Sequence, residues 1–148
     1  MKAPALAVAS IAAGAIVVAG CGGNSKAQSA SDFVRQVTSE FSRGQAGRLW
    51  DQLHPADQAV VTRSRFIACQ SNQGFGLRRF QVLETYEETV PVGGKNAEST
   101  AVSVQVTSDD GVTTATLHAV RVNGEWRWIL RPADHAAYKR GACPSSRG

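Results

Sequence analysis

Apolar residues at helical spacing predict that the chain enters its folded region as a helix. Phe33, Val37 and Phe41 stand four residues apart and would form one stripe of that helix. Ser31–Asp32 can cap its start and Gly44 can end it. The same spacing rules predict further short helices over 46–53, 55–61 and 65–70, and a last one over 132–139.

After residue 77 the pattern changes from helical spacing to alternation, which predicts strands. The expected strands cover 80–92, 101–106, 112–122 and 125–131. Alternation places Phe80, Val82, Tyr86, Val90 and Val92 on one side of the first strand. Short turns rich in Gly, Asn and Asp separate the strands, so they must form an antiparallel meander. Helices followed by such a sheet indicate an α+β domain with its N-terminal helices packed on the sheet.

The first twenty residues have the pattern of an export signal. Lys2 is the only charge before an uncharged, mostly apolar run that ends in small residues. The sequence Val18-Ala19-Gly20-Cys21 resembles the lipobox of bacterial lipoproteins. The resemblance implies that a signal peptide (1–20) is removed and that a diacylglycerol is attached to the sulfur of Cys21. An ordinary signal peptide with an incidental cysteine is the alternative.

Lipidation at Cys21 would decide where the protein resides. Buried acyl chains hold a protein stably at a membrane, so we expect it on the extracytoplasmic face of the cell membrane. Residues 21–31 carry no large apolar side chain and are expected to be a flexible tether. A single domain is then expected over 32–144, followed by a short tail over 145–148.

Two cysteines remain after Cys21 is assigned to lipid. Cys69 and Cys143 are predicted to form a disulfide, because a lone pair in a small exported domain is usually bridged. A buried free thiol or a metal ligand is the alternative for each. Neither cysteine belongs to a CxxC or HxxxH pattern, so no metal is expected.

Composition and charge exclude several classes of function. The chain has 148 residues, which is too few for a multidomain enzyme, and 43% hydrophobic residues, which is too many for a disordered chain. Its net charge of +4 drops to +3 without Lys2, which is too little to indicate a nucleic-acid partner. No phosphate loop, nucleophile elbow or zinc signature is present, so no cofactor is expected.

Two motifs frame the predicted domain: the helix end Trp50-Asp51-Gln52-Leu53-His54-Pro55 and the closing strand Asn123-Gly124-Glu125-Trp126-Arg127-Trp128-Ile129. Together with the order of helices before a sheet, they resemble the nuclear transport factor 2-like superfamily, which includes ketosteroid isomerase. The likeness covers about residues 31–131 and implies a cone-shaped domain with a strongly bent sheet. It is nearest to exported lipoproteins of high-GC Gram-positive bacteria. In those proteins a cysteine near the third helix pairs with one after the last strand.

A cone implies a pocket between sheet and helices for a small apolar ligand. Its expected lining residues are Trp50, Tyr86, His118 and Trp128. Weak candidates for catalysis are His118 or Glu88 as a base, with Tyr86 beside them. The first helix lacks the tyrosine that holds the oxyanion in ketosteroid isomerase, so the likeness to that enzyme fails there.

Two hypotheses follow for the function. The first is a non-enzymatic binding module for a small apolar ligand or a cell-envelope protein, with a homodimer through the sheet as a further option. The second is a small isomerase or dehydratase that uses the cone pocket. Among the other chemically versatile residues, His54 is expected to cap or pack, His135 to face solvent, and all three tryptophans to lie mainly in the core.

Overall fold

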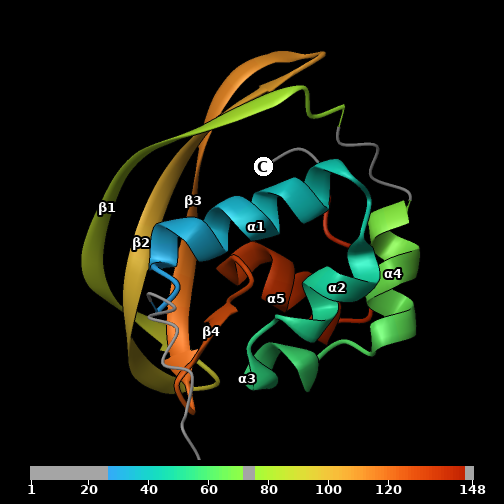
Figure 1. Cartoon of the computed structure of the whole chain (residues 1–148). Coiled ribbons are helices and arrows are strands. Elements are labelled where there is room, and N and C mark those ends of the chain that lie inside the picture. The colour runs from blue at the N-terminus through green and yellow to red at the C-terminus, as the bar shows by residue number, and fades with distance from the viewer. Residues whose placement is uncertain (1–26, 72–75, 146–148) are drawn as a thin grey trace, which may run out of the picture.

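A computed structural model describes residues 27–71 and 76–145 and confirms the α+β class (Figure 1). Cys21, the signal peptide and most of the predicted tether lie outside the described residues. The helices are α1 (Ala30–Ser42), α2 (Ala46–Asp51), α3 (Pro55–Gln58), α4 (Arg63–Ser71) and α5 (Pro132–Lys139). The strands are β1 (Arg79–Val92), β2 (Lys95–Ser108), β3 (Gly111–Val122) and β4 (Glu125–Trp128).

The ends of the helices differ from the predicted ones by a few residues because other side chains act as caps. Helix α1 begins at Ala30, and the Ser29 side chain accepts a hydrogen bond from the backbone N–H of Asp32. Gly44 follows this helix with a φ of +66°, as expected for a residue that ends it. Helix α3 is shorter than predicted and stops at Gln58.

The four strands form one open antiparallel sheet in the order β1-β2-β3-β4, as the short turns predicted. Asn123 and Gly124 between β3 and β4 both have positive φ, the backbone form of a tight two-residue hairpin turn. Strand β4 ends at Trp128, earlier than predicted, because the backbone of Trp128 forms hydrogen bonds with the segment that follows α2. The N–H of Trp128 donates to the carbonyl of Gln52, and the Trp128 carbonyl accepts from the N–H of His54.

One β-bulge overturns the predicted facing of β1. Val82 pairs with Val104, but after the irregularity at Leu83 the pairing resumes with Glu84 opposite Ser103. An extra residue in a strand inverts the alternation beyond it. Tyr86 therefore lies on the face opposite to Val82, and the prediction that they share a side is wrong.

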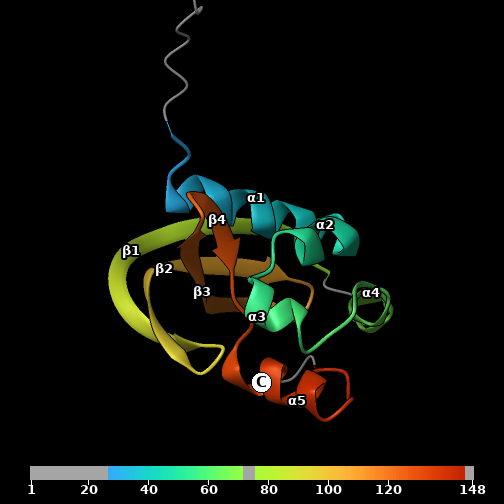
Figure 2. The same ribbon diagram turned by 90° about the horizontal axis from the view of Figure 1, so that it is seen from below.

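The hydrophobic core lies between the helices and one face of the sheet. Figure 2 shows α1 running across the sheet, α5 on the opposite side of the molecule and α3 between these two helices. Val102, Ala119 and Trp128 belong to the sheet's contribution to this core. The core's helical contribution comes from Phe33, Val34, Val37, Leu49 and Phe66. The ring of Trp128 packs 5.6 Å from that of Phe41 and 6.2 Å from that of Phe66, measured between centroids.

The C-terminal segment is fastened to the helices in two ways. The predicted disulfide between Cys69 and Cys143 is confirmed, and Cys69 is 1% exposed within the core. In addition, Nδ1 of His135 lies 2.7 Å from Oδ1 of Asp57. The second carboxylate oxygen of Asp57 accepts a hydrogen bond from the backbone N–H of Leu130. The prediction that His135 faces solvent is confirmed only in part, because its side chain is 32% exposed while the buried Asp57 carboxylate holds one ring nitrogen. No helix in the described part of the chain is long and apolar enough to cross a membrane.

Candidate functional site

Three predicted catalytic candidates lie close together on one face of the sheet. Tyr86, Ala101 and His118 stand opposite one another on β1, β2 and β3. Nε2 of His118 pairs with a carboxylate oxygen of Glu88, and Tyr86 is exposed. This face is opposite to the one that Val102 presents to the core, because neighbouring residues of a strand point to opposite sides.

Of the two tryptophans expected to line a pocket, Trp128 lies in the core and Trp50 is partly buried against it. The indole N–H of Trp128 donates to the carbonyl of Leu49 at 2.8 Å, and that of Trp50 donates to the carbonyl of Val61 at 3.0 Å. Both polar atoms are therefore satisfied by backbone, as packing residues require. The structure thus places Trp128 in the core, Trp50 at the edge of the core, and Tyr86 and His118 on the other sheet face.

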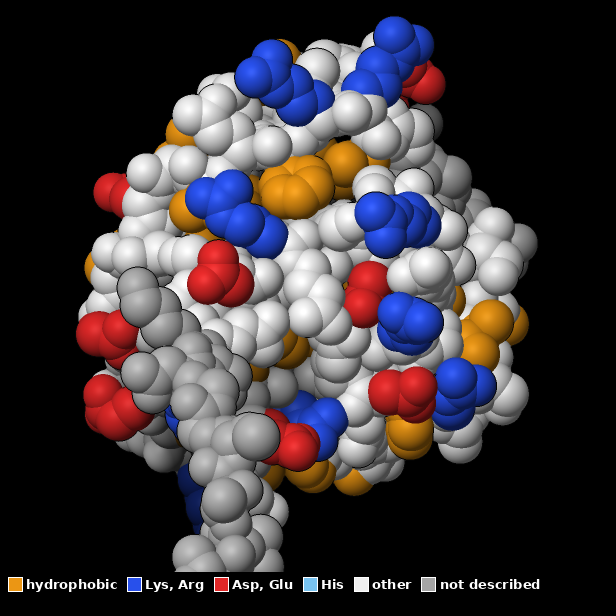
Figure 3. All heavy atoms as spheres, viewed as in Figure 1, with side chains coloured by type: hydrophobic (Ala, Val, Ile, Leu, Met, Phe, Trp, Pro, Cys, Tyr) orange, Lys and Arg blue, Asp and Glu red, His pale blue; other side chains and the backbone are white. Residues whose placement is uncertain are grey.

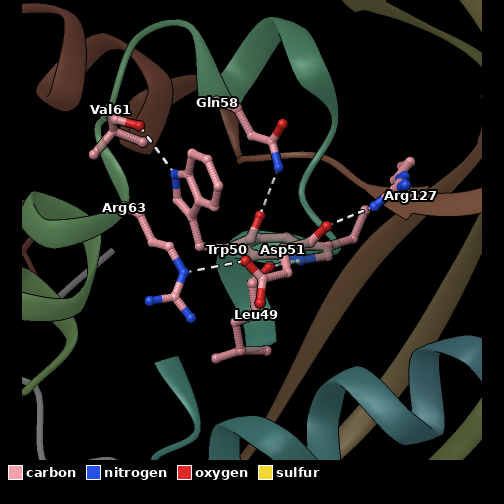
Figure 4. Close-up of polar contacts among 8 residues, drawn as sticks. Leu49, Trp50, Asp51, Gln58, Val61, Arg63 and Arg127 are labelled. Atoms are coloured by element: carbon pink, nitrogen blue, oxygen red, sulfur yellow. Dashed lines mark hydrogen bonds and ion pairs between the residues drawn. The ribbon is translucent and has the colours of Figure 1, made fainter. Parts of the chain in front are cut away.

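Helix α2 is held in place by polar contacts around Asp51 (Figure 4). Its carboxylate accepts a hydrogen bond from Arg63 at 3.1 Å, and its backbone carbonyl accepts one from Arg127 at 2.5 Å. The side chain of Gln58 donates to the carbonyl of Trp50 at 2.8 Å. These contacts join α2 to α3, α4 and β4, and so fix the helix end that borders the cavities.

Two cavities open beside β4. The first, here called the His54 cavity, has a volume of about 340 Å³. Its lining residues are His54, Glu87, Ala97, Glu98, Ser99, Thr100, Ala119, Val120, Arg121 and Trp126. The second, here called the Gln52 cavity, has a volume of about 470 Å³. Its lining residues are Ala27, Gln28, Phe33, Gln36, Gln52, Arg121, Gly124, Glu125, Trp126 and Arg127.

His54 presents a neutral imidazole to the first cavity. Burial lowers its pKa, an effect that the nearby Asp57 opposes and Arg127 reinforces. Its Nδ1 accepts the backbone N–H of Ala56 and so caps α3, which confirms the predicted capping role. With Nδ1 occupied as an acceptor, the proton of the neutral ring is on Nε2.

Side-chain amides and one buried carboxylate line and support the second cavity. Glu40 is 4% exposed and accepts hydrogen bonds from the amides of Gln36 at 3.2 Å and of Gln52 at 2.7 Å. Because a carboxylate needs donors, these contacts fix which end of each amide faces Glu40. The remaining amide oxygen of Gln52 is buried and has no partner among the described residues.

Arg121 and Trp126 border both cavities. The guanidinium of Arg121 lies 4.2 Å from the centre of the Trp126 ring and donates to the carbonyl of Gly124. The indole N–H of Trp126 donates to the carbonyl of Gln28 at 2.7 Å, which holds the segment before α1 against β4. Trp126 is therefore a half-buried residue of the site and not only part of the core.

The sequence analysis did not select most of these lining residues. One signal was available for Arg121: the Asn123-Gly124 turn places Arg121 directly opposite Trp126. No sequence signal marks Gln52, since its contact with Glu40 depends on how α1 and α2 pack. Within residues 27–71 and 76–145, no group of three His, Cys, Asp or Glu side chains is placed to hold a metal ion.

Comparison with known proteins does not assign the chain to a family. No protein-family model matches the chain, and no curated protein matches it either. The function is therefore argued from the site itself and from the sequence features described above.

Proposed function

We propose that this protein is a lipid-anchored binding module on the extracytoplasmic face of the cell membrane. It recognises its ligand at the two cavities beside Trp126 and does not catalyse a reaction. The observation that carries this proposal is the contrast between a filled interior and open cavities whose walls mix polar and apolar side chains. Trp128 and Phe66 occupy the space where an apolar ligand would sit, so recognition is assigned to the cavities.

The proposed location rests on two independent features. The lipobox-like residues before Cys21 indicate an exported lipoprotein, although Cys21 itself lies outside the described residues. The disulfide between Cys69 and Cys143 supports export, since such bonds persist in oxidising compartments. Export in turn supports an envelope ligand over an intracellular one.

We further propose that the domain belongs to the nuclear transport factor 2-like class of cone-shaped folds. The order of helices before a curved antiparallel meander supports this proposal (Figure 2). Such a fold places residues from strand ends and from helix ends around a common opening, which is where His54 and Trp126 meet.

The alternative of a small isomerase or dehydratase has less support. His118 and Glu88 are paired with each other and line neither cavity. A general base must lie within hydrogen-bond reach of the proton that it removes from a bound substrate. A binding function needs no such residue and agrees better with these positions.

The anchoring part of the proposal is tested by Cys21→Ser. The variant should be released from membranes into the soluble fraction, because no sulfur remains for the lipid. The matched control Ser25→Ala should stay in the membrane fraction, and its intact mass should exceed that of polypeptide 21–148 by the mass of the lipid. Continued membrane retention of Cys21→Ser would contradict the proposal.

A further inference from the structure

We propose that the Gln52 cavity binds a neutral saccharide. This inference rests on the proposed binding function and names the class of ligand for one of its two cavities. Four observations support it: unused hydrogen-bond acceptors, a nearly balanced charge, an aromatic wall and the position next to the predicted anchor.

Hydrogen-bond acceptors with spare capacity lie at the cavity wall. The Gln52 amide commits its nitrogen to Glu40, which leaves its oxygen without a partner among the described residues. The exposed Gln28 amide donates to Gln36, and its own oxygen has no partner among the described residues. A buried acceptor without a partner destabilises the folded protein, so a ligand rich in donors is favoured. Sugar hydroxyls are such donors, whereas phosphate and carboxylate groups offer acceptors only.

The cavity lining carries a small net positive charge, from Arg121 and Arg127 against Glu125, and the buried Glu40 behind the wall offsets one of the arginines. Arg127 pairs with Glu125 at 2.6 Å, and Arg121 is stacked on Trp126. Lys and Arg side chains also alternate with Asp and Glu side chains over the neighbouring face of the molecule around α1 (Figure 3). This surface does not present one sign of charge, so it favours a neutral ligand over an anionic polymer.

Aromatic residues supply the apolar part of the wall. Trp126 and Phe33 both line the cavity, and Trp126 is half-buried with its N–H already bonded to Gln28. Sugar rings combine apolar C–H faces with hydroxyl edges, and the C–H faces pack favourably on aromatic surfaces. Polar groups that fix orientation beside an aromatic wall are what such a ligand requires.

The cavity lies next to the point where the chain leads to the predicted anchor. Ala27 and Gln28 form part of its rim, and Cys21 precedes Ala27 by six positions. Six extended residues span at most about 20 Å. A lipidated Cys21 would therefore keep the cavity within reach of both sugar headgroups in the membrane and glycan chains beside it.

The test uses the mature chain purified in detergent micelles from the membranes that hold it. Isothermal titration calorimetry is run with triacetylchitotriose and with mannotriose, and flotation is run with phosphatidylcholine vesicles that contain or lack diglucosyl diacylglycerol. Saturable binding of a soluble oligosaccharide would indicate a glycan chain as the source of the sugar. Flotation that depends on the glycolipid alone would indicate a membrane headgroup, and either result supports the proposal.

Two variants tie binding to the cavity. Gln52→Met and the exposed Gln28→Ala should each weaken binding by about 3- to 10-fold, as expected for one lost hydrogen bond. The control Gln70→Met removes another buried amide oxygen without a described partner, but Gln70 lines neither cavity, so binding should be unchanged. Circular dichroism checks that each variant is folded. If Gln52→Met does not fold, Gln28→Ala alone decides the test.

Three outcomes would overturn the inference. The first is that the protein binds none of these sugars. The second is that Gln28→Ala binds with wild-type affinity and that Gln52→Met, if it folds, does so too. The third is that inorganic phosphate displaces the sugar. A protein that stays anchored but binds no sugar refutes the ligand class alone. A protein that binds sugar but is not released by Cys21→Ser refutes the anchoring part of the proposed function alone.

Discussion

Trp126 and Trp128 stand two residues apart on β4 and point to the same face of the sheet, yet their surroundings differ. Trp128 is 6% exposed and packs among the rings of Phe41 and Phe66. Trp126 is half-buried between two cavities, with Arg121 stacked on its ring. Alternation along a strand therefore decides the face of a side chain, while coverage by helices decides whether that residue becomes core or site.

Both indole N–H groups donate to backbone carbonyls, but they fasten different parts of the chain. Trp128 holds Leu49 at the middle of α2, whereas Trp126 holds Gln28 just before α1. The first contact lies in the core and the second at the rim of the Gln52 cavity. We call the region around Trp128 the filled end of the sheet and the region around Trp126 the cavity end.

The largest expected effect is the difference between truncating the two tryptophans. Trp128→Ala should lower the free energy of unfolding by about 3–5 kcal/mol, because it leaves a cavity in a packed core. Trp126→Ala should cost about 1–2 kcal/mol, since a half-buried ring beside open cavities leaves less packing to lose. Urea unfolding followed by circular dichroism measures both values, and equal losses would refute the distinction between the two ends.

Removing the disulfide should have the next largest effect, and it acts on the filled end. Cys69 and Cys143 are 74 positions apart, and a loop of that size is worth about 4 kcal/mol in the chain-entropy model. The double variant Cys69→Ser/Cys143→Ser should therefore lose about 2–5 kcal/mol of unfolding free energy.

Reductant provides the matched control for the disulfide. It should lower the stability of the wild-type protein toward that of the double serine variant and leave that variant unchanged. A wild-type protein whose unfolding midpoint is the same with and without reductant would show that the bond does not stabilise the fold.

Local sequence signals were enough to predict most of the fold. Helical spacing, the change to alternation and the tight turns specify a helix-then-meander order, and the cysteine count specifies the disulfide. The bulge at Leu83 was not predictable from alternation, because one inserted residue reverses the facing of Tyr86 while leaving the hydrophobic pattern intact. The early end of β4 depends on hydrogen bonds to Gln52 and His54, which are distant in sequence.

The candidate site was much harder to predict than the fold. The hypothesis favoured Trp50 and His118 because aromatic and histidine residues often line binding sites. Trp50 packs against the core, His118 pairs with Glu88, and neither residue lines one of the two cavities. Besides Trp126, the cavities are lined mainly by small, amide and charged side chains, such as Gln52 and Arg121, whose role depends on tertiary contacts. Such residues are common on any surface, so no local pattern distinguishes the ones that line a cavity.

The smallest expected effect concerns the pair of His118 and Glu88, on the sheet face opposite to the core. Their side chains are 26% and 38% exposed, and partly solvated ion pairs are generally worth no more than about 1 kcal/mol. A double-mutant cycle with His118→Gln and Glu88→Gln should give a coupling free energy in that range, measured by urea unfolding. Ligand binding at the cavity end should be unchanged in both single variants. Loss of binding in either variant would show that these two residues contribute to the functional site, and it would support the enzymatic hypothesis.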